Sequence, residues 1–97
     1  MAVQAKQGRR YAIGWRVGTQ NVCYSKGGKR FAEIEAAREA MLHDVRAFEG
    51  RHGQLFHCIV DVTTRQVVEV APGSLHVLVG EVATMVGKSM VEAGEQV

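Results

Sequence analysis

The chain has 97 residues, of which 46% are hydrophobic and 23% charged, and its formal net charge is +2. This length and composition predict one small domain with its own core, and they exclude two separate domains or a largely disordered chain. No run of about 18 apolar residues is present, which excludes a membrane-spanning helix. The polar, basic N-terminus lacks the apolar run of a signal peptide, so a cytoplasmic location is expected.

Residues 1–10 are expected to form a flexible basic arm, and residues 11–97 a single α+β domain. From Tyr11 to Val17, aromatic and β-branched residues alternate with small or polar ones, which predicts a strand. A four-residue turn then leads to a returning strand that contains Val22 and Tyr24. The following residues, Lys26 to Arg30, read KGGKR and predict a flexible basic loop.

The next element is predicted to be an amphipathic helix over residues 31–48. Its apolar residues recur at steps of three, four and seven, which places them on one face of a helix that packs on a sheet. They are Phe31, Ile34, Met41, Leu42, Val45 and Phe48. Gly50 follows the last of them and can adopt the left-handed conformation that ends a helix.

The second half of the chain predicts a similar order of elements. Strands are expected over Leu55–Val62 and Val67–Ala71, joined by a tight turn. Helical spacing predicts a second helix over Leu75–Glu92, although two glycines and five valines weaken it and a strand over His76–Val79 competes. The predicted fold is therefore ββαββα, a four-stranded antiparallel sheet with two helices packed on one face. The halves, about 11–49 and 55–92, fit either a duplication or the ordinary likeness of two ββα units.

Basic charge is concentrated at the start of the chain. Residues 1–32 carry seven cations and no acid, whereas residues 33–97 carry five basic and ten acidic residues. Such a positive field favours a polyanion, because each phosphate that is neutralised releases counterions. A two-stranded ribbon can enter the major groove of DNA, and Gly27 and Gly28 let backbone N–H groups approach a phosphate. The candidate nucleic-acid-binding residues are Lys6, Arg9, Arg10, Arg16, Lys26, Lys29 and Arg30.

The sheet face away from the helices is the second candidate surface. Alternation is expected to turn Tyr11, Ile13, Trp15 and Val17, with Phe56, Cys58, Val60 and Val62, toward the helices. The opposite face is then too apolar for open water, which indicates a homodimer, a partner protein or a small ligand. Its residues include Ala12, Gly14, Arg16, Cys23, Leu55, His57 and Ile59. Arg16 and His57 would be the polar groups of this alternative site.

Catalytic and metal motifs are weak in this sequence. Cys23 and His57 could share the outer sheet face as a Cys–His pair, but a thiol packed in a sheet is the more ordinary interpretation. The four histidines lack metal-ligand spacing, and neither a CxxC motif nor a Gly-rich nucleotide loop occurs. No catalytic residue, metal or cofactor is assigned. The sequence favours a small binding protein over an enzyme, with nucleic acid as the first ligand and a homodimeric interaction or small-ligand module as the alternative.

Overall fold

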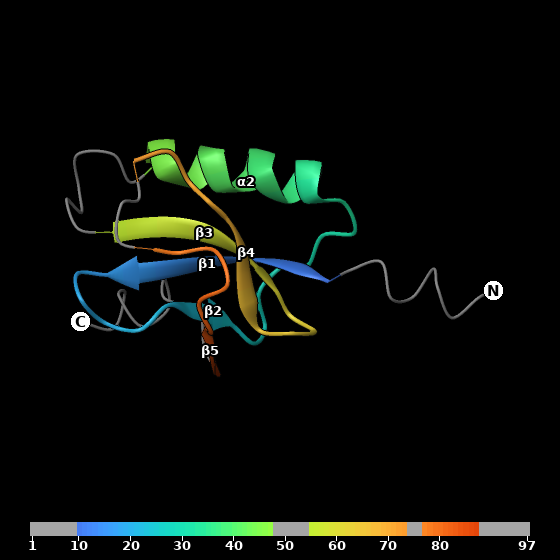
Figure 1. Ribbon diagram of the computed structural model, residues 1–97. Helices are drawn as coiled ribbons and strands as arrows, with labels where there is room; N and C mark the ends of the chain where they lie inside the picture. The colour runs from blue at the N-terminus through green and yellow to red at the C-terminus, as the bar shows by residue number, and fades with distance from the viewer. Residues whose placement is uncertain (1–9, 48–54, 74–76, 88–97) are drawn as a thin grey trace.

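The computed structural model describes residues 10–47, 55–73 and 77–87. Its elements are β1 (Tyr11–Val17), β2 (Cys23–Ser25), α2 (Ile34–Ala47), β3 (Leu55–Asp61), β4 (Gln66–Val70) and β5 (Thr84–Val86). The strands form one sheet in the order β4-β3-β1-β2-β5, and α2 lies across one face of it (Figure 1). β5 pairs with β2 in parallel and the other pairs are antiparallel, so the sheet is mixed.

The predicted ββαββα fold with two helices on a four-stranded antiparallel sheet is therefore wrong. Residues 77–87 form a turn and β5 where a helix was expected. Gly80 has a φ of 93° and lies in a turn closed by a hydrogen bond from the Glu81 N–H to the Leu78 carbonyl at 3.1 Å. The valines here prefer extended backbone, and they outweigh the helical spacing. The described residues hold no second ββα unit, and the competing strand is not formed at residues 77–79.

Helix α2 begins at Ile34, three residues later than predicted. The Phe31 N–H donates to the Tyr11 carbonyl at 2.9 Å, and the Tyr11 N–H donates to the Phe31 carbonyl at 3.1 Å. Because the backbone of Phe31 is committed to the sheet, it cannot also form the first helical turn. The predicted end of the helix, residues 48–50, lies outside the described ranges.

Residues 77–83, here called the crossing segment, return across the sheet face opposite α2 (Figure 1). The Gly80 N–H donates to the Val67 carbonyl at 2.7 Å, and the Ala83 N–H donates to the Arg65 carbonyl at 2.7 Å. The crossing segment is thus hydrogen-bonded to β4, and it continues directly into β5 beside β2. The two outer strands are joined in this way, and the sheet curls into a partly closed barrel.

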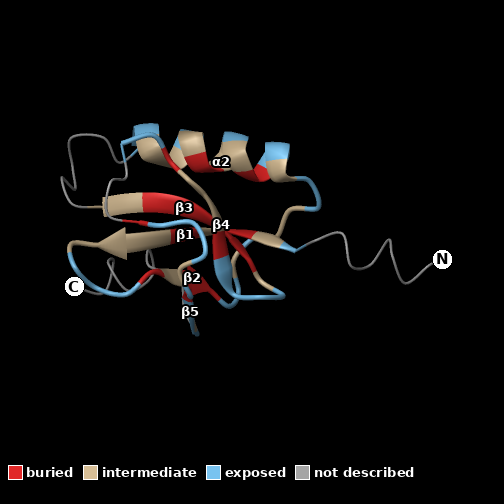
Figure 2. Ribbon diagram, viewed as in Figure 1, coloured by how far each residue is buried: buried red, intermediate tan, exposed pale blue. Residues whose placement is uncertain are grey.

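Two apolar clusters pack on the two faces of this sheet, and buried positions lie on its strands and on the side of α2 that faces the sheet (Figure 2). The cluster under α2 consists of Ala37, Met41, Ile59 and Ala71, with Tyr11, Ile13, Phe31, Ile34, Val45 and Val68 around them. The cluster inside the barrel consists of Ala12, Val22, Tyr24, Cys58, Val60, Val67, Val77 and Ala83. Val77 and Ala83 come from the crossing segment, so that segment is part of the core.

The register between β1 and β3 corrects the predicted faces of the sheet. Gly14 lies opposite Cys58 and Ile13 lies opposite Ile59. Leu55, His57 and Ile59 therefore share the α2 side with Tyr11 and Ile13, whereas Phe56, Cys58, Val60 and Val62 share the other side with Ala12 and Gly14. The crossing segment covers that other side. The open apolar face that was expected there is filled by the chain itself.

Candidate functional site

The structure separates the seven candidate cations into groups with different surroundings. Lys6 and Arg9 lie outside the described residues. Arg10 and Arg16 each form an ion pair with a carboxylate of the same chain. Lys26, Lys29 and Arg30 lie together in the loop between β2 and Phe31. The positive field of the sequence is therefore reduced on the strand and retained in the loop.

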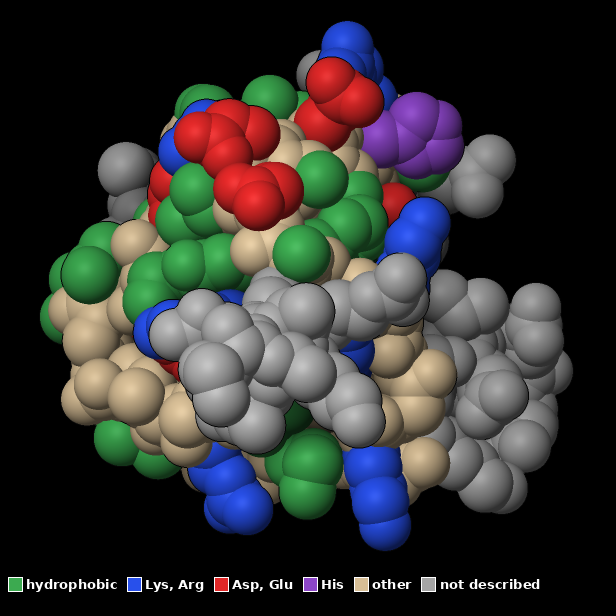
Figure 3. All heavy atoms as spheres, turned by 90° about the vertical axis from the view of Figure 1, so that its right-hand side faces the viewer, with side chains coloured by type: hydrophobic (Ala, Val, Ile, Leu, Met, Phe, Trp, Pro, Cys, Tyr) green, Lys and Arg blue, Asp and Glu red, His purple; other side chains and the backbone are tan. Residues whose placement is uncertain are grey.

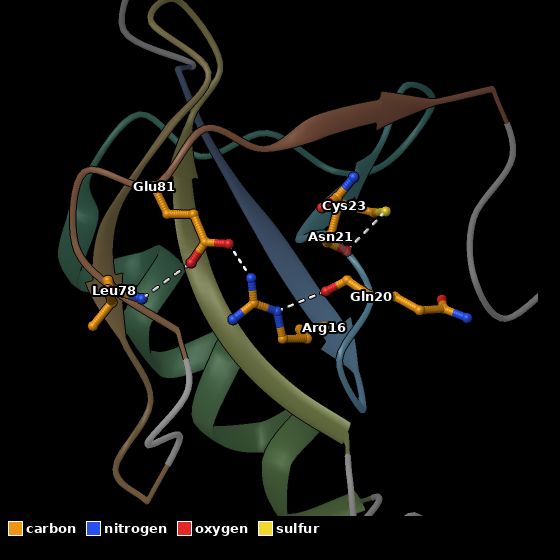
Figure 4. Close-up of polar contacts among 6 residues, drawn as sticks. All are labelled: Arg16, Gln20, Asn21, Cys23, Leu78 and Glu81. Carbon is orange, nitrogen blue, oxygen red and sulfur yellow. Dashed lines mark hydrogen bonds and ion pairs between the residues drawn. The ribbon is translucent and has the colours of Figure 1, made fainter.

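Arg16 fastens the crossing segment to β1 (Figure 4). Its Nη2 pairs with Oε2 of Glu81, and its Nε donates to the Gln20 carbonyl at 2.7 Å. The other carboxylate oxygen of Glu81 accepts the Leu78 N–H at 3.3 Å. The Arg16 side chain is only 14% exposed. Its charge is used inside the fold, so Arg16 does not belong to a surface for phosphate.

Arg10 is paired with Asp61 at the end of β3. The Arg10 Nε lies 3.0 Å from Oδ2 of Asp61, and the Thr63 N–H donates to Oδ1 at 2.9 Å. Burial raises the pKa of Asp61, but the hydrogen bonds from Arg10 and Thr63 lower that pKa by more, so it stays below its ordinary value. The carboxylate is ionised and saturated with donors, and Arg10 holds the turn between β3 and β4.

The loop of residues 26–30 exposes two lysines. Lys26 and Lys29 are exposed, and the Lys29 ammonium lies 5.4 Å from the centre of the Phe31 ring. Within the described part of the chain, neither lysine forms a salt bridge. Arg30 is half-buried and donates to backbone carbonyls of its own loop. Carbonyls carry no net charge, so the loop keeps three positive charges.

Arg65 is a further cation at the same end of the sheet as the loop of residues 26–30, and it was not among the candidate residues predicted from the sequence. Tyr11 pairs with Asp61 on one side and with Phe31 on the other. The turn that contains Arg65 and the loop that contains Lys29 therefore begin two strand spacings apart, roughly 10 Å. Arg65 is exposed and has a φ of 61°. In the sequence it stands among the acidic residues, and only the strand register reveals its neighbours.

The four cations Lys26, Lys29, Arg30 and Arg65 are here called the basic end of the sheet. Figure 3 faces the side of the molecule on which these turns lie; acidic side chains gather near the top with some Lys and Arg side chains beside them, and further Lys and Arg side chains project at the bottom. The charge division of the sequence is thus retained in part. One side of the molecule carries the acidic helix, and the other carries the basic end.

The hairpin of β1 and β2 does not form a free ribbon. β1 is the central strand and pairs with β3 along its whole length, while β2 pairs with β5. Tyr24 is 1% exposed and belongs to the core. The hairpin is therefore not free to enter a groove of DNA as a separate ribbon.

The Cys23 and His57 pair does not form a catalytic unit. Both residues lie opposite Trp15 in register, one on each side of β1, so they are roughly 10 Å apart. Burial raises the pKa of the Cys23 thiol, and it raises the pKa of the Cys58 thiol to about 12. Both thiols are therefore protonated at neutral pH and are poor nucleophiles.

His57 gives the fold a dependence on pH. It is buried on the α2 side of β3, and burial lowers its pKa although the Asp44 carboxylate opposes this. The unfolded chain binds a proton near pH 6.5, before the folded chain does, so the free energy of unfolding is expected to fall as the pH drops below that value. In thermal melts between about pH 7.5 and 5, His57→Gln is expected to flatten this fall in Tm.

The exposed histidine of α2 supplies the control for this prediction. His43→Gln is expected to keep the pH dependence of the wild-type protein, because His43 is exposed. If Tm depended on pH equally in both variants, His57 would not be the cause of the pH dependence of stability.

Neither a metal centre nor a membrane span is found among the described residues. No three His, Cys, Asp or Glu side chains in these ranges gather as ligands for an ion. No described helix combines the length and the apolar composition that crossing a bilayer requires. No protein-family model matches the chain, and comparison with curated proteins and with solved structures finds no significant match.

Proposed function

We propose that this protein binds nucleic acid through the phosphate backbone, at the basic end of the sheet. The observation that supports this proposal is the exposure of Lys26, Lys29 and Arg65 around strand ends whose nearby carboxylate, Asp61, is buried and already paired with Arg10. The charges at this end are therefore available to an external anion.

Backbone contacts are the interaction that such a surface supports. Lysine and arginine side chains at loop tips reach phosphates, and these contacts position a protein without reading base edges. Among the described residues, no exposed helix or free ribbon lies at this end to enter a groove. The proposed binding is thus electrostatic, little dependent on sequence, and weakened by salt.

The variant Lys26→Ala/Lys29→Ala tests this proposal. Both side chains are exposed, so the fold is expected to be unaffected. In titrations of short DNA and RNA, single-stranded and duplex, the slope of log K against log salt is expected to fall by about 1 to 2 units. Arg30 is left in place because it shapes the loop.

Arg46→Ala is the matched control. Arg46 is exposed in the last turn of α2, and within the described ranges its side chain donates to the Leu42 carbonyl of its own helix at 3.4 Å. It is expected to keep the wild-type salt slope. An unchanged slope in the double lysine variant, or no binding by the wild-type protein at low salt, would refute the proposal.

The alternative function, association with a second copy of the chain, needs a different surface from the one first expected. Leu78, Val79 and Val82 are each about two-thirds exposed, and Met85 is 39% exposed. These residues follow one another along the crossing segment and β5, where contact with a second copy would bury apolar area. Sedimentation separates the two functions: a monomer at tens of micromolar removes the dimer and leaves the basic end untouched.

A further inference from the structure

Arg30 organises the loop of the basic end from within. Its Nη1 donates to the carbonyls of Ser25 at 3.1 Å and Gly28 at 3.0 Å, and its Nη2 donates to the carbonyl of Lys26 at 3.1 Å. The guanidinium carbon lies 5.7 Å from the centre of the buried Tyr24 ring. One side chain therefore holds two carbonyls of the five-residue loop and one of the last residue of β2, and it is itself placed against the core.

This arrangement fixes the direction of the loop's N–H groups. In a trans peptide the carbonyl and the next residue's N–H point in opposite directions, and no cis peptide occurs in the described ranges. Because the carbonyls of Lys26 and Gly28 point toward the guanidinium, the N–H groups of Gly27 and Lys29 point away from it. The described structure gives neither of these two groups an acceptor.

The neighbouring N–H groups are already used. The Lys26 N–H donates to the Val86 carbonyl at 2.6 Å, and the Gly28 N–H donates to the Ser25 carbonyl at 3.4 Å. The space beside Gly27 is open, since a Cβ built there meets no atom within 4 Å. The side of the loop away from Arg30 thus presents two backbone donors and an accessible glycine, and the loop also exposes the side chains of Lys26 and Lys29.

We propose that the N–H groups of Gly27 and Lys29, together with the ammonium groups of Lys26 and Lys29, bind one phosphate group of a nucleic-acid backbone. This inference rests on the proposed function and gives it a specific contact. Backbone N–H groups of a turn that face outward on the same side form anion sites, and lysines of the same loop add charge. Arg30 is a positioning residue: it orients the donors from the opposite side of the loop and does not touch the phosphate.

The test follows the backbone amides of the full-length ¹⁵N-labelled protein by NMR. The probes are inorganic phosphate and a short single-stranded oligonucleotide with and without a 5′-phosphate. The amide signals of Gly27 and Lys29 are expected to shift in a saturable way with each probe. Those of Lys26 and Gly28 are expected to shift less, because their N–H groups already donate to carbonyls.

A second variant separates loop geometry from charge. Arg30→Lys keeps the charge but has one donor nitrogen in place of the two that reach these carbonyls, so affinity for the oligonucleotide is expected to fall about tenfold, as for one lost charge-assisted hydrogen bond. Arg46→Lys is the control and is expected to bind like the wild-type protein. An unchanged far-UV spectrum and Tm confirm that Arg30→Lys is folded, and wild-type affinity in that folded variant would overturn the role of Arg30.

The outcomes distinguish this inference from the proposed function. If the oligonucleotide binds but the Gly27 and Lys29 signals stay in place, the phosphate site is refuted and nucleic-acid binding remains. If inorganic phosphate shifts these signals and no oligonucleotide binds, the nucleic-acid source is refuted. If these signals shifted only with the 5′-phosphorylated oligonucleotide, the site would bind a terminal phosphate, and binding of a backbone phosphate would be refuted.

Discussion

Gly14→Ala is expected to lower the free energy of unfolding by about 2 to 3 kcal/mol, as overpacking of a core does. A Cβ at Gly14 would lie 2.8 Å from Cγ2 of Val60, 3.0 Å from Sγ of Cys58 and 3.1 Å from the backbone oxygen of Cys23. The first two neighbours belong to the core inside the barrel, and the third is main chain of the adjacent strand. None of them can move without disturbing the sheet. Urea denaturation measures the effect.

Gly27→Ala is the matched control for this prediction. The same methyl group at Gly27 meets no atom within 4 Å, and the position is exposed. Its stability is therefore expected to change by less than about 0.5 kcal/mol, as at most surface sites. If Gly14→Ala proved as stable as Gly27→Ala, β1 would not pack as closely on β2 and β3 as described.

Met41→Ala is expected to cost about 3 kcal/mol, within the range for a methionine removed from a core. Met41 is fully buried in the middle of α2, and with Ala37 it packs on Ile59 of β3 and Ala71. Removing its side chain leaves a cavity between the helix and the sheet. Thermal and urea denaturation are both expected to show the loss.

Leu78→Ala provides the comparison for Met41→Ala. Leu78 is also a large apolar residue, but it is 67% exposed in the turn of the crossing segment. Its loss is expected to change the free energy of unfolding by less than about 0.5 kcal/mol. Equal losses in the two variants would show that α2 does not lie on the sheet through Met41.

The regular parts of this fold could be predicted from the sequence because they depend on local patterns. The alternation from Tyr11 to Val17 and from Leu55 to Val62 predicted two strands, which form as β1 and β3, and the apolar spacing through Met41 predicted α2. The first residues of that helix could not be predicted in this way. The pairing of Phe31 with Tyr11 is a contact between distant residues that removes Phe31 from the helix.

The second predicted helix failed for a related reason. Leu75, Leu78, Val82 and Met85 do recur at helical spacing, yet Leu78, Val82 and Met85, the three of them that the structure describes, are exposed. The spacing was coincidental. The conformation of this segment is determined by the turn at Gly80 and by the hydrogen bonds to β4. These satisfy the backbone N–H and carbonyl groups better than a helix interrupted by glycine would.

The candidate site could be predicted only in part. The loop from Lys26 to Arg30 was recognised from its composition, and its lysines are exposed. The pairing of Arg16 with Glu81 and the approach of Arg65 could not be foreseen, because each depends on strand register between segments far apart in the chain. The sign of a cluster of charged residues can be predicted from composition, whereas its neutralisation by carboxylates depends on tertiary contacts.

The parallel pairing of β5 with β2 has a consequence for how the chain acquires its structure. Cys23 and Thr84 are neighbours in space although most of the described chain separates them. Contacts of such long range form slowly, because a large loop must close first. During synthesis, the packing of Val22 and Tyr24 against Val77 and Ala83 is therefore expected only after the latter two residues have left the ribosome. Until then, these core residues are accessible to chaperones.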